Sequence, residues 1–159
     1  MYAFAIVSFL AVAFSTGFFS AAKVTTNTEL QQARAAAVAH NMAVYHEAAL
    51  RYARENPTAS GTLPESGLRL PAGYTKFQSW TATRNALTGQ LVVSSQMTAN
   101  SGLVPRNIAR HVAELRDMPV TAGVSTGGGL TGPNGVISTA DIPTLSGGRE
   151  SVVILTIQR

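Results

Sequence analysis

The chain has 159 residues, which leaves room for one small domain once its apolar N-terminal segment is set aside. Its net charge is +4, and its basic residues are scattered, not gathered into a stripe with interleaved aromatics, which argues against nucleic-acid binding. It has no cysteine, so a disulfide framework and a thiolate metal site are both excluded.

Residues 1–22 (MYAFAIVSFLAVAFSTGFFSAA) form an apolar segment with no charged side chain before Lys23. As an α-helix, residues 2–22 would extend about 31 Å, close to the hydrocarbon thickness of a bilayer. Apolar side chains would cover every side of this helix, which is typical of a helix in lipid. A cleaved signal peptide is the main alternative, because Ser20 and Ala22 are small residues suited to cleavage. We expect a retained transmembrane anchor.

The charges that follow the anchor give a weak indication of its orientation. Lys23, Glu29 and Arg34 lie on its C-terminal side, and the positive-inside rule then slightly favours a cytoplasmic domain. Lys23 is also expected to attract anionic lipid headgroups.

Residues 23–56 are expected to form an amphipathic connecting helix. Capping-box patterns at Thr26 and Thr28 predict that a helix begins or restarts there, and Pro57 predicts an end at or before Asn56. One stripe of this helix carries residues at alternating spacings of three and four: Ala35, Val38, Met42, Tyr45, Ala49 and Tyr52. This stripe is either a surface for partner helices or the core face under the protein's own sheet, and we favour the core.

Residues 57–159 are expected to form a globular α+β domain. The Pro- and Gly-rich residues 57–75 predict a loop whose Leu63, Leu68 and Leu70 pack on the core. Strands are then expected over 74–82 and 90–96, around a hairpin loop at 85–89. A helix is expected from Leu103, with Ile108, Val112 and Leu115 on its apolar edge. After it we expect a strand over 120–125, a glycine-rich loop over 126–135 and a strand over 136–138.

The β-branched residues of 151–158 (SVVILTIQ) predict a central strand. The order of elements therefore predicts an α+β fold, in which an N-terminal transmembrane helix continues into an amphipathic helix packed on a small, mainly antiparallel sheet.

Two short motifs resemble catalytic signatures but lack the required context. Gly127, Gly129 and Gly132 spell G-x-G-x-x-G, yet Pro133 follows where a phosphate-binding helix should begin, which favours a turn-rich loop. Residues 123–127 spell the G-x-S-x-G nucleophile elbow.

An elbow around Ser125 would need an acid and then a histidine later in the chain. Asp141 could supply the acid, but all three histidines (His40, His46 and His111) precede Ser125. Ser125 with His111 is the best remaining pair for a hydrolase.

A metal site would combine the histidines with Glu47, Asp117 or Asp141. His40 and His46 are six residues apart, which turns them about 240° from each other on a helix, so they do not converge. Glu114 and Asp117 are interpreted as ordinary charge pairs with Arg106, Arg110 and Arg116. We therefore predict no catalytic, cofactor-binding or metal-binding residue, and no enzyme activity.

Six segments of the chain are similar to a known family. They are M-A-V-Y-H-E-A-A-L-R-Y (42–52), E-N-P (55–57), L-P-A-G-Y (70–74), G-L-V-P-R-N-I-A-R-H-V (102–112), V-T-A-G-V-S (120–125) and G-P-N-G-V-I (132–137). Together they resemble the small PilM proteins encoded with type IVb pilus systems of conjugative plasmids. The actin-like ATPases that share this name in other pilus systems are a different family.

This resemblance implies an inner-membrane protein required for pilus biogenesis, with its domain in the periplasm. That implied orientation outweighs the weak charge signal. The layout also resembles that of pilins, but a pilin would carry a glutamate five residues after its cleavage glycine. Residue five here is Ala5, and the fifth residue after Gly17 is Ala22.

We therefore expect a non-enzymatic, single-pass inner-membrane component of pilus assembly, which contacts membrane lipid and binds other assembly proteins or pilins. No cofactor, nucleic acid or small-molecule substrate is expected. The alternatives are a minor pilin-like subunit in the fibre and a secreted periplasmic enzyme.

Overall fold

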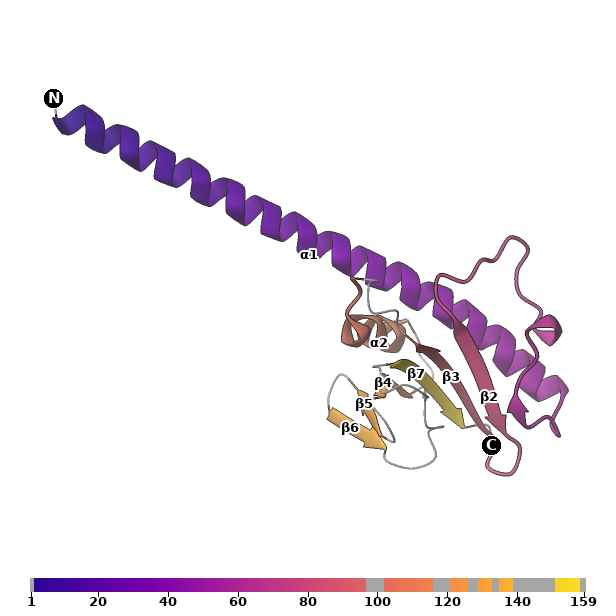
Figure 1. Cartoon of the computed structure of the whole chain (residues 1–159). Helices are drawn as coiled ribbons and strands as arrows, with labels where there is room; N and C mark the ends of the chain where they lie inside the picture. The colour runs from indigo at the N-terminus through magenta and orange to yellow at the C-terminus, as the bar shows by residue number, and fades with distance from the viewer. Residues whose placement is uncertain are drawn as a thin grey trace. The chain divides into compact units, whose positions relative to one another are not determined.

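The computed structural model describes residues 2–96, 102–115, 121–125, 129–132, 135–138 and 151–157. For residues 2–26, 96, 137–138 and 157 it describes the backbone alone. The elements are α1 (Tyr2–Glu55), β1 (Gly61–Thr62), the 3-10 helix η1 (Glu65–Gly67), β2 (Trp80–Asn85), β3 (Gln90–Gln96), α2 (Pro105–Glu114), β4 (Thr121–Ser125), β5 (Leu130–Gly132), β6 (Gly135–Ser138) and β7 (Ser151–Ile157) (Figure 1).

The chain divides into two compact units, Met1–Ala33 and Arg34–Arg159. The first is helical from Tyr2, and the side chains of residues 27–33 are exposed. The anchor predicted over residues 1–22 lies outside the residues whose side chains are described. No helix in the described part of the chain is long and apolar enough to cross a membrane.

Helix α1 corrects one prediction about the N-terminal region. A helix was expected to begin or restart near Thr26 and Thr28, but α1 continues without a break from Tyr2 to Glu55. Threonine costs only a few tenths of a kcal/mol inside a helix, and the surrounding Ala, Lys, Leu and Gln residues favour the helix, so a capping pattern does not force an end. The predicted C-terminal end before Pro57 is confirmed.

The second unit contains one seven-stranded sheet in the order β1-β2-β3-β7-β4-β5-β6, with every neighbouring pair antiparallel. Strand β7 occupies the centre, as the sequence predicts. Ile154 of β7 pairs with Val93 of β3 on one side and with Ala122 of β4 on the other. Directly paired residues lie on the same face of a sheet, so these three side chains form one apolar row.

The main core lies between this face of the sheet and the two helices of the unit (Figure 1). Residues 34–55 of α1 contribute Met42 and Tyr45 to this core, β2 contributes Trp80, and α2 contributes Ile108, Ala109 and Val112. In the loop after α1, Leu63 and Leu68 are buried and Leu70 packs against the core, as predicted. The predicted α+β fold, with a helix packed on an antiparallel sheet, is therefore confirmed.

Three boundaries differ from the prediction. Strand β2 begins at Trp80 and not at residue 74, because the preceding backbone bonds to α1 and not to β3. Leu115, predicted on the apolar edge of α2, is the C-cap and is 49% exposed. The glycine-rich stretch, predicted to be a loop, contains strand β5, whose Thr131 pairs with Val124 of β4. Hydrogen bonds to a neighbouring strand can hold a segment extended even where its residues have a weak β-strand propensity.

A smaller cluster, Val92, Leu130, Val153 and Leu155, is buried on the other face of the sheet. Gly123 lies beside it in β4 and pairs with Val153. A Cβ atom at Gly123 would lie 2.6 Å from the carbonyl oxygen of Thr131 and 2.8 Å from Cδ1 of Leu130. The first glycine of the G-x-S-x-G match is therefore required by strand packing.

Gly123→Ala is expected to lower the free energy of unfolding by roughly 1–3 kcal/mol, because the added methyl group overlaps backbone that cannot easily move. Denaturant unfolding of the full chain measures the change. Thr81→Ala, at an exposed strand position, serves as the control and should change stability by less than about 0.5 kcal/mol. Equal unfolding midpoints for Gly123→Ala and the unaltered chain would contradict this packing.

Candidate functional site

The stripe predicted on the connecting helix lies inside the domain. Five of its residues are at most 6% exposed and belong to the main core, while Tyr52 is partly buried and packs against it. The structure thus places all six in one packed region: Ala35, Val38, Met42, Tyr45, Ala49 and Tyr52. In this arrangement the stripe offers no surface to a partner helix, so candidate binding sites have to be sought elsewhere on the domain.

Asn41, beside this stripe, fixes the segment that leads into β2. Its Oδ1 accepts hydrogen bonds from Trp80 Nε1 at 3.0 Å, from the backbone N–H of Phe77 at 3.1 Å and from the Tyr74 hydroxyl at 3.1 Å. Its Nδ2 donates to the carbonyl of Thr75 at 3.0 Å. One amide therefore satisfies polar groups from four residues and holds their segment against α1.

Two tyrosines at this network, Tyr45 and Tyr74, have raised pKa values. Burial, with a contribution from Glu65, raises the pKa of Tyr45. Burial also raises the pKa of Tyr74 to about 12, helped by Tyr45 and Glu65 and opposed by the hydrogen bond with Trp80. Lys76 Nζ lies 2.7 Å from Glu65 Oε2 and 5.9 Å from the centre of the Tyr45 ring. These contacts join the loop to α1 and indicate a structural role.

Two further buried polar residues also make structural contacts. Arg84 Nη1 donates to the carbonyls of Asn56 at 2.6 Å and Ala59 at 3.3 Å, at the C-terminal end of α1 where the helix dipole favours a cation. His46 is fully buried, and its Nε2 lies 2.8 Å from Thr156 Oγ1 of β7. His46 thus connects α1 to the central strand.

The residues weighed for metal binding are dispersed. His40 is exposed, His46 is buried, and His111 Nδ1 lies 3.0 Å from Glu114 Oε2. Within the described ranges, no group of three or more His, Cys, Asp or Glu residues could hold a metal ion. Asp117 and Asp141 lie outside the described residues.

The structure does not bring Ser125 and His111 together as a catalytic pair. Val124 packs in the core that includes α2, and consecutive residues of a strand point to opposite faces. Ser125 therefore faces away from α2, which carries His111, and it is 2% exposed. In the G-x-G-x-x-G match, Gly132 belongs to β5, whereas Gly127 lies outside the described residues.

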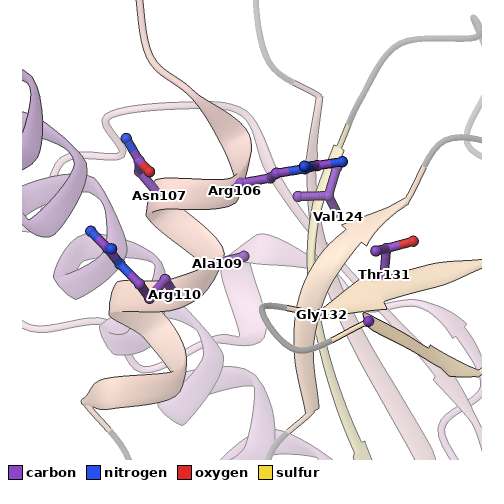
Figure 2. A pocket seen from close by; sticks show the side chains of 8 residues that line it. Arg106, Asn107, Ala109, Arg110, Val124, Thr131 and Gly132 are labelled. Atoms are coloured by element: carbon purple, nitrogen blue, oxygen red, sulfur yellow. The ribbon is translucent and has the colours of Figure 1, made fainter.

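A pocket of about 350 Å³ lies between α2 and strands β4 to β6, and Figure 2 shows the side chains around it. Figure 2 also shows Arg106 extending from α2 towards Val124 of β4. The lining residues are Arg106, Asn107, Ala109, Arg110, Val124, Thr131, Gly132 and Gly135.

This pocket combines a basic rim with an apolar floor. Arg106 and Arg110 are one helical turn apart on α2, but Figure 2 shows only the Arg106 side chain extending towards Val124, while the Arg110 side chain extends away from β4 and β5. Ala109 and Val124 are 2% and 5% exposed and supply the apolar part. Thr131, on β5, adds a hydroxyl group. The arrangement suits a ligand that carries both a negative charge and apolar atoms.

Sequence reasoning missed this pocket. The i,i+4 spacing of Arg106 and Arg110 was available as a signal, but both were interpreted as ordinary charge pairs with nearby acidic residues. Among the described residues, only Arg110 of these two arginines has an acidic partner. Its Nε atom lies 3.7 Å from Oε1 of Glu114. The opposite wall lies in the stretch that was predicted to be a loop, so nothing indicated that it faces α2.

The sequence model of the PilM family matches residues 9–154, which includes both helices and every residue of the pocket. The chain belongs to the PilM family. No curated protein and no solved structure gives a match. Membership in the PilM family indicates a role in pilus biogenesis and confirms the predicted family, while the link to type IVb systems of conjugative plasmids stays a prediction.

Asn41→Ala is expected to destabilise the domain by roughly 1–3 kcal/mol, because the Trp80 indole and the Phe77 amide lose their shared acceptor. Trp80 is the only tryptophan, so its fluorescence reports both unfolding and the local change. His40→Ala, at the neighbouring exposed position, is the control. An unfolding midpoint for Asn41→Ala that equals that of the control would contradict the role given to Asn41.

Stability is expected to fall as the pH rises from about 10 to about 12, since the pKa of Tyr74 is raised from 10.0 to about 12 by folding. In this window the unfolded chain has lost the Tyr74 proton and the folded chain retains it, so unfolding is favoured. Below pH 10 both states are protonated and the contribution is complete.

Tyr74→Phe should remove part of this fall in stability between pH 10 and about 12. It also lowers stability at neutral pH, because the hydrogen bonds to Asn41 are lost. Unfolding midpoints measured at several alkaline pH values give the slope for both chains. Parallel curves for Tyr74→Phe and the unaltered chain would contradict the raised pKa.

Proposed function

We propose that the chain is a non-enzymatic, single-pass inner-membrane component required for type IVb pilus biogenesis. Its domain would face the periplasm and bind other assembly proteins or pilins. The observation that carries this proposal is the match of the PilM family to residues 9–154, almost the whole chain. Pilus assembly requires many contacts between membrane-attached proteins, and a small domain tethered by a helix suits such contacts.

The apolar sequence of residues 1–22 supports the proposed membrane attachment. These residues and the core-forming residues 34–55 belong to one helix, α1. An anchor in the apolar segment would therefore be continuous with the helix on which the domain is built.

Two observations support a binding role over a catalytic one. Ser125 and His111, the best pair for a hydrolase in the sequence, are on different faces of the sheet. The pocket beside α2 offers arginines, a hydroxyl group and apolar side chains, which are groups that bind a ligand without providing a nucleophile and base.

A minor pilin-like subunit in the fibre is the second candidate. The packing of residues 34–55 on an antiparallel sheet favours it, because pilins share this layout. The fifth residue after Gly17 is Ala22 and not the glutamate of a pilin, which favours the assembly role.

Deletion of the gene is expected to abolish pili, and the full chain supplied in trans should restore them. Electron microscopy counts the pili, and fractionation locates the chain. We expect the chain in carbonate-washed membranes and not in sheared, purified pili. Protease should digest the domain only after the outer membrane is opened.

Pili at normal abundance in the deletion strain would contradict the assembly role. Recovery of the chain in sheared pili would favour the subunit role. A mature N-terminus near Lys23 in the soluble periplasmic fraction would contradict the anchor.

A further inference from the structure

We propose that the pocket between α2 and strands β4 to β6 binds an acidic segment of a protein partner, with Arg106 pairing to a carboxylate and Arg110 adding positive charge at the edge of the pocket. This inference rests on the proposed function, since it specifies the chemistry of the partner that the domain binds. It assigns the contact to a defined site on the domain.

The pocket carries positive charge from α2. Arg106 and Arg110 lie one helical turn apart and both line the pocket. Among the described residues, Arg106 has no hydrogen-bond or ion-pair partner, and Arg110 has only the 3.7 Å contact with Glu114. Arg110 and Glu114 side chains are 47% and 57% exposed, and an exposed pair of this kind is weak, so a ligand carboxylate can replace it.

The size of the pocket limits what can enter it. A volume of about 350 Å³ is at the lower end of ligand pockets, and it suits one or two side chains more than an entire folded surface. The methylene groups of a Glu or Asp side chain can pack on Ala109 and Val124 while the carboxylate reaches a guanidinium. Arginine is well suited to this, because its planar group binds both carboxylate oxygens.

The pocket also differs from surfaces that bind anionic lipid. Recognition of anionic lipid usually uses a projecting cluster of four to eight Lys and Arg residues. This pocket is recessed, has two arginines and an apolar floor, and has no lysine among its described lining residues. These features favour an acidic side chain that enters a cavity over a flat layer of headgroups.

The test uses the full chain in detergent and a labelled glutamate-rich peptide, with the same peptide carrying Gln in place of every Glu as the reference. Fluorescence anisotropy measures binding. Arg106→Gln with Arg110→Gln should weaken binding of the glutamate peptide by roughly tenfold or more, since hydrogen bonds to charged groups are lost. Both residues are on the rim of the pocket and outside the core, so the fold should be retained, which circular dichroism checks.

Two further variants separate a defined site from general attraction. Arg51→Gln with Arg69→Gln removes the same charge from exposed positions outside the pocket and should leave the affinity unchanged. Thr131→Trp leaves the charge unchanged but fills the pocket from an exposed strand position, and it should weaken binding as strongly as loss of the arginines.

Equal affinity of the glutamate and glutamine peptides would overturn the proposal, as would unchanged binding after Arg106→Gln with Arg110→Gln. Competition by inorganic phosphate as effective as by unlabelled peptide would also overturn it. Binding of the chain to phosphatidylglycerol vesicles through these arginines, without binding of the peptide, would assign the pocket to lipid.

The outcome for the pocket is separable from the outcome for the proposed function. Loss of pili on gene deletion, with peptide binding unaffected by Arg106→Gln and Arg110→Gln, would refute the pocket alone. Normal pili on deletion, with peptide binding lost in the double variant, would refute the pilus role and retain the acidic-peptide site.

Discussion

The domain depends on close packing between residues 34–55 of α1 and one face of the sheet. Small residues of α1 are buried in this packing: Ala35, Ala39, Ala49 and Ala53 are each at most 1% exposed. Met42 and Tyr45 then fill the remaining space, each at most 2% exposed. Interiors are packed as densely as organic crystals, so neither large residues throughout nor alanines alone would form this interface. Asn41 and Arg84 extend the same attachment to the loop after α1.

This packing has a direct consequence for function. A helix face that forms the core of its own domain is not available to pilins or assembly proteins in the folded state. The proposed binding of such partners therefore needs another surface of the domain, and the pocket beside α2 is a described cavity there that combines charge with an apolar floor. Arg106 and Arg110 can fulfil this role because the core uses the opposite side of α2, where Ile108 and Val112 are fully buried.

The sequence was sufficient for the elements with strong periodicity or strong propensity. It predicted β3, the central position of β7, the end of α1 before Pro57 and the burial of Leu63 and Leu68. It failed in two places. Near Thr26 and Thr28 the capping patterns had no effect, because the surrounding residues favour a continuing helix. In the glycine-rich stretch a long-range contact overrides the local signal, because β5 forms beside β4. The pocket was missed for the same reason, since its walls come from α2 and β5, which only the tertiary fold brings together.

Thiol labelling distinguishes a stripe of α1 that is core from a stripe that is a partner surface. The chain has no cysteine, so each introduced cysteine is the only thiol. Val38→Cys, Met42→Cys and Ala49→Cys place it on the stripe, and His40→Cys and Glu47→Cys place it at exposed positions of the same helix. In membranes from pilus-producing cells, maleimide should label the two exposed positions rapidly and the three stripe positions only after denaturation. Labelling of the stripe positions in the folded chain at the rate of His40→Cys would contradict the account.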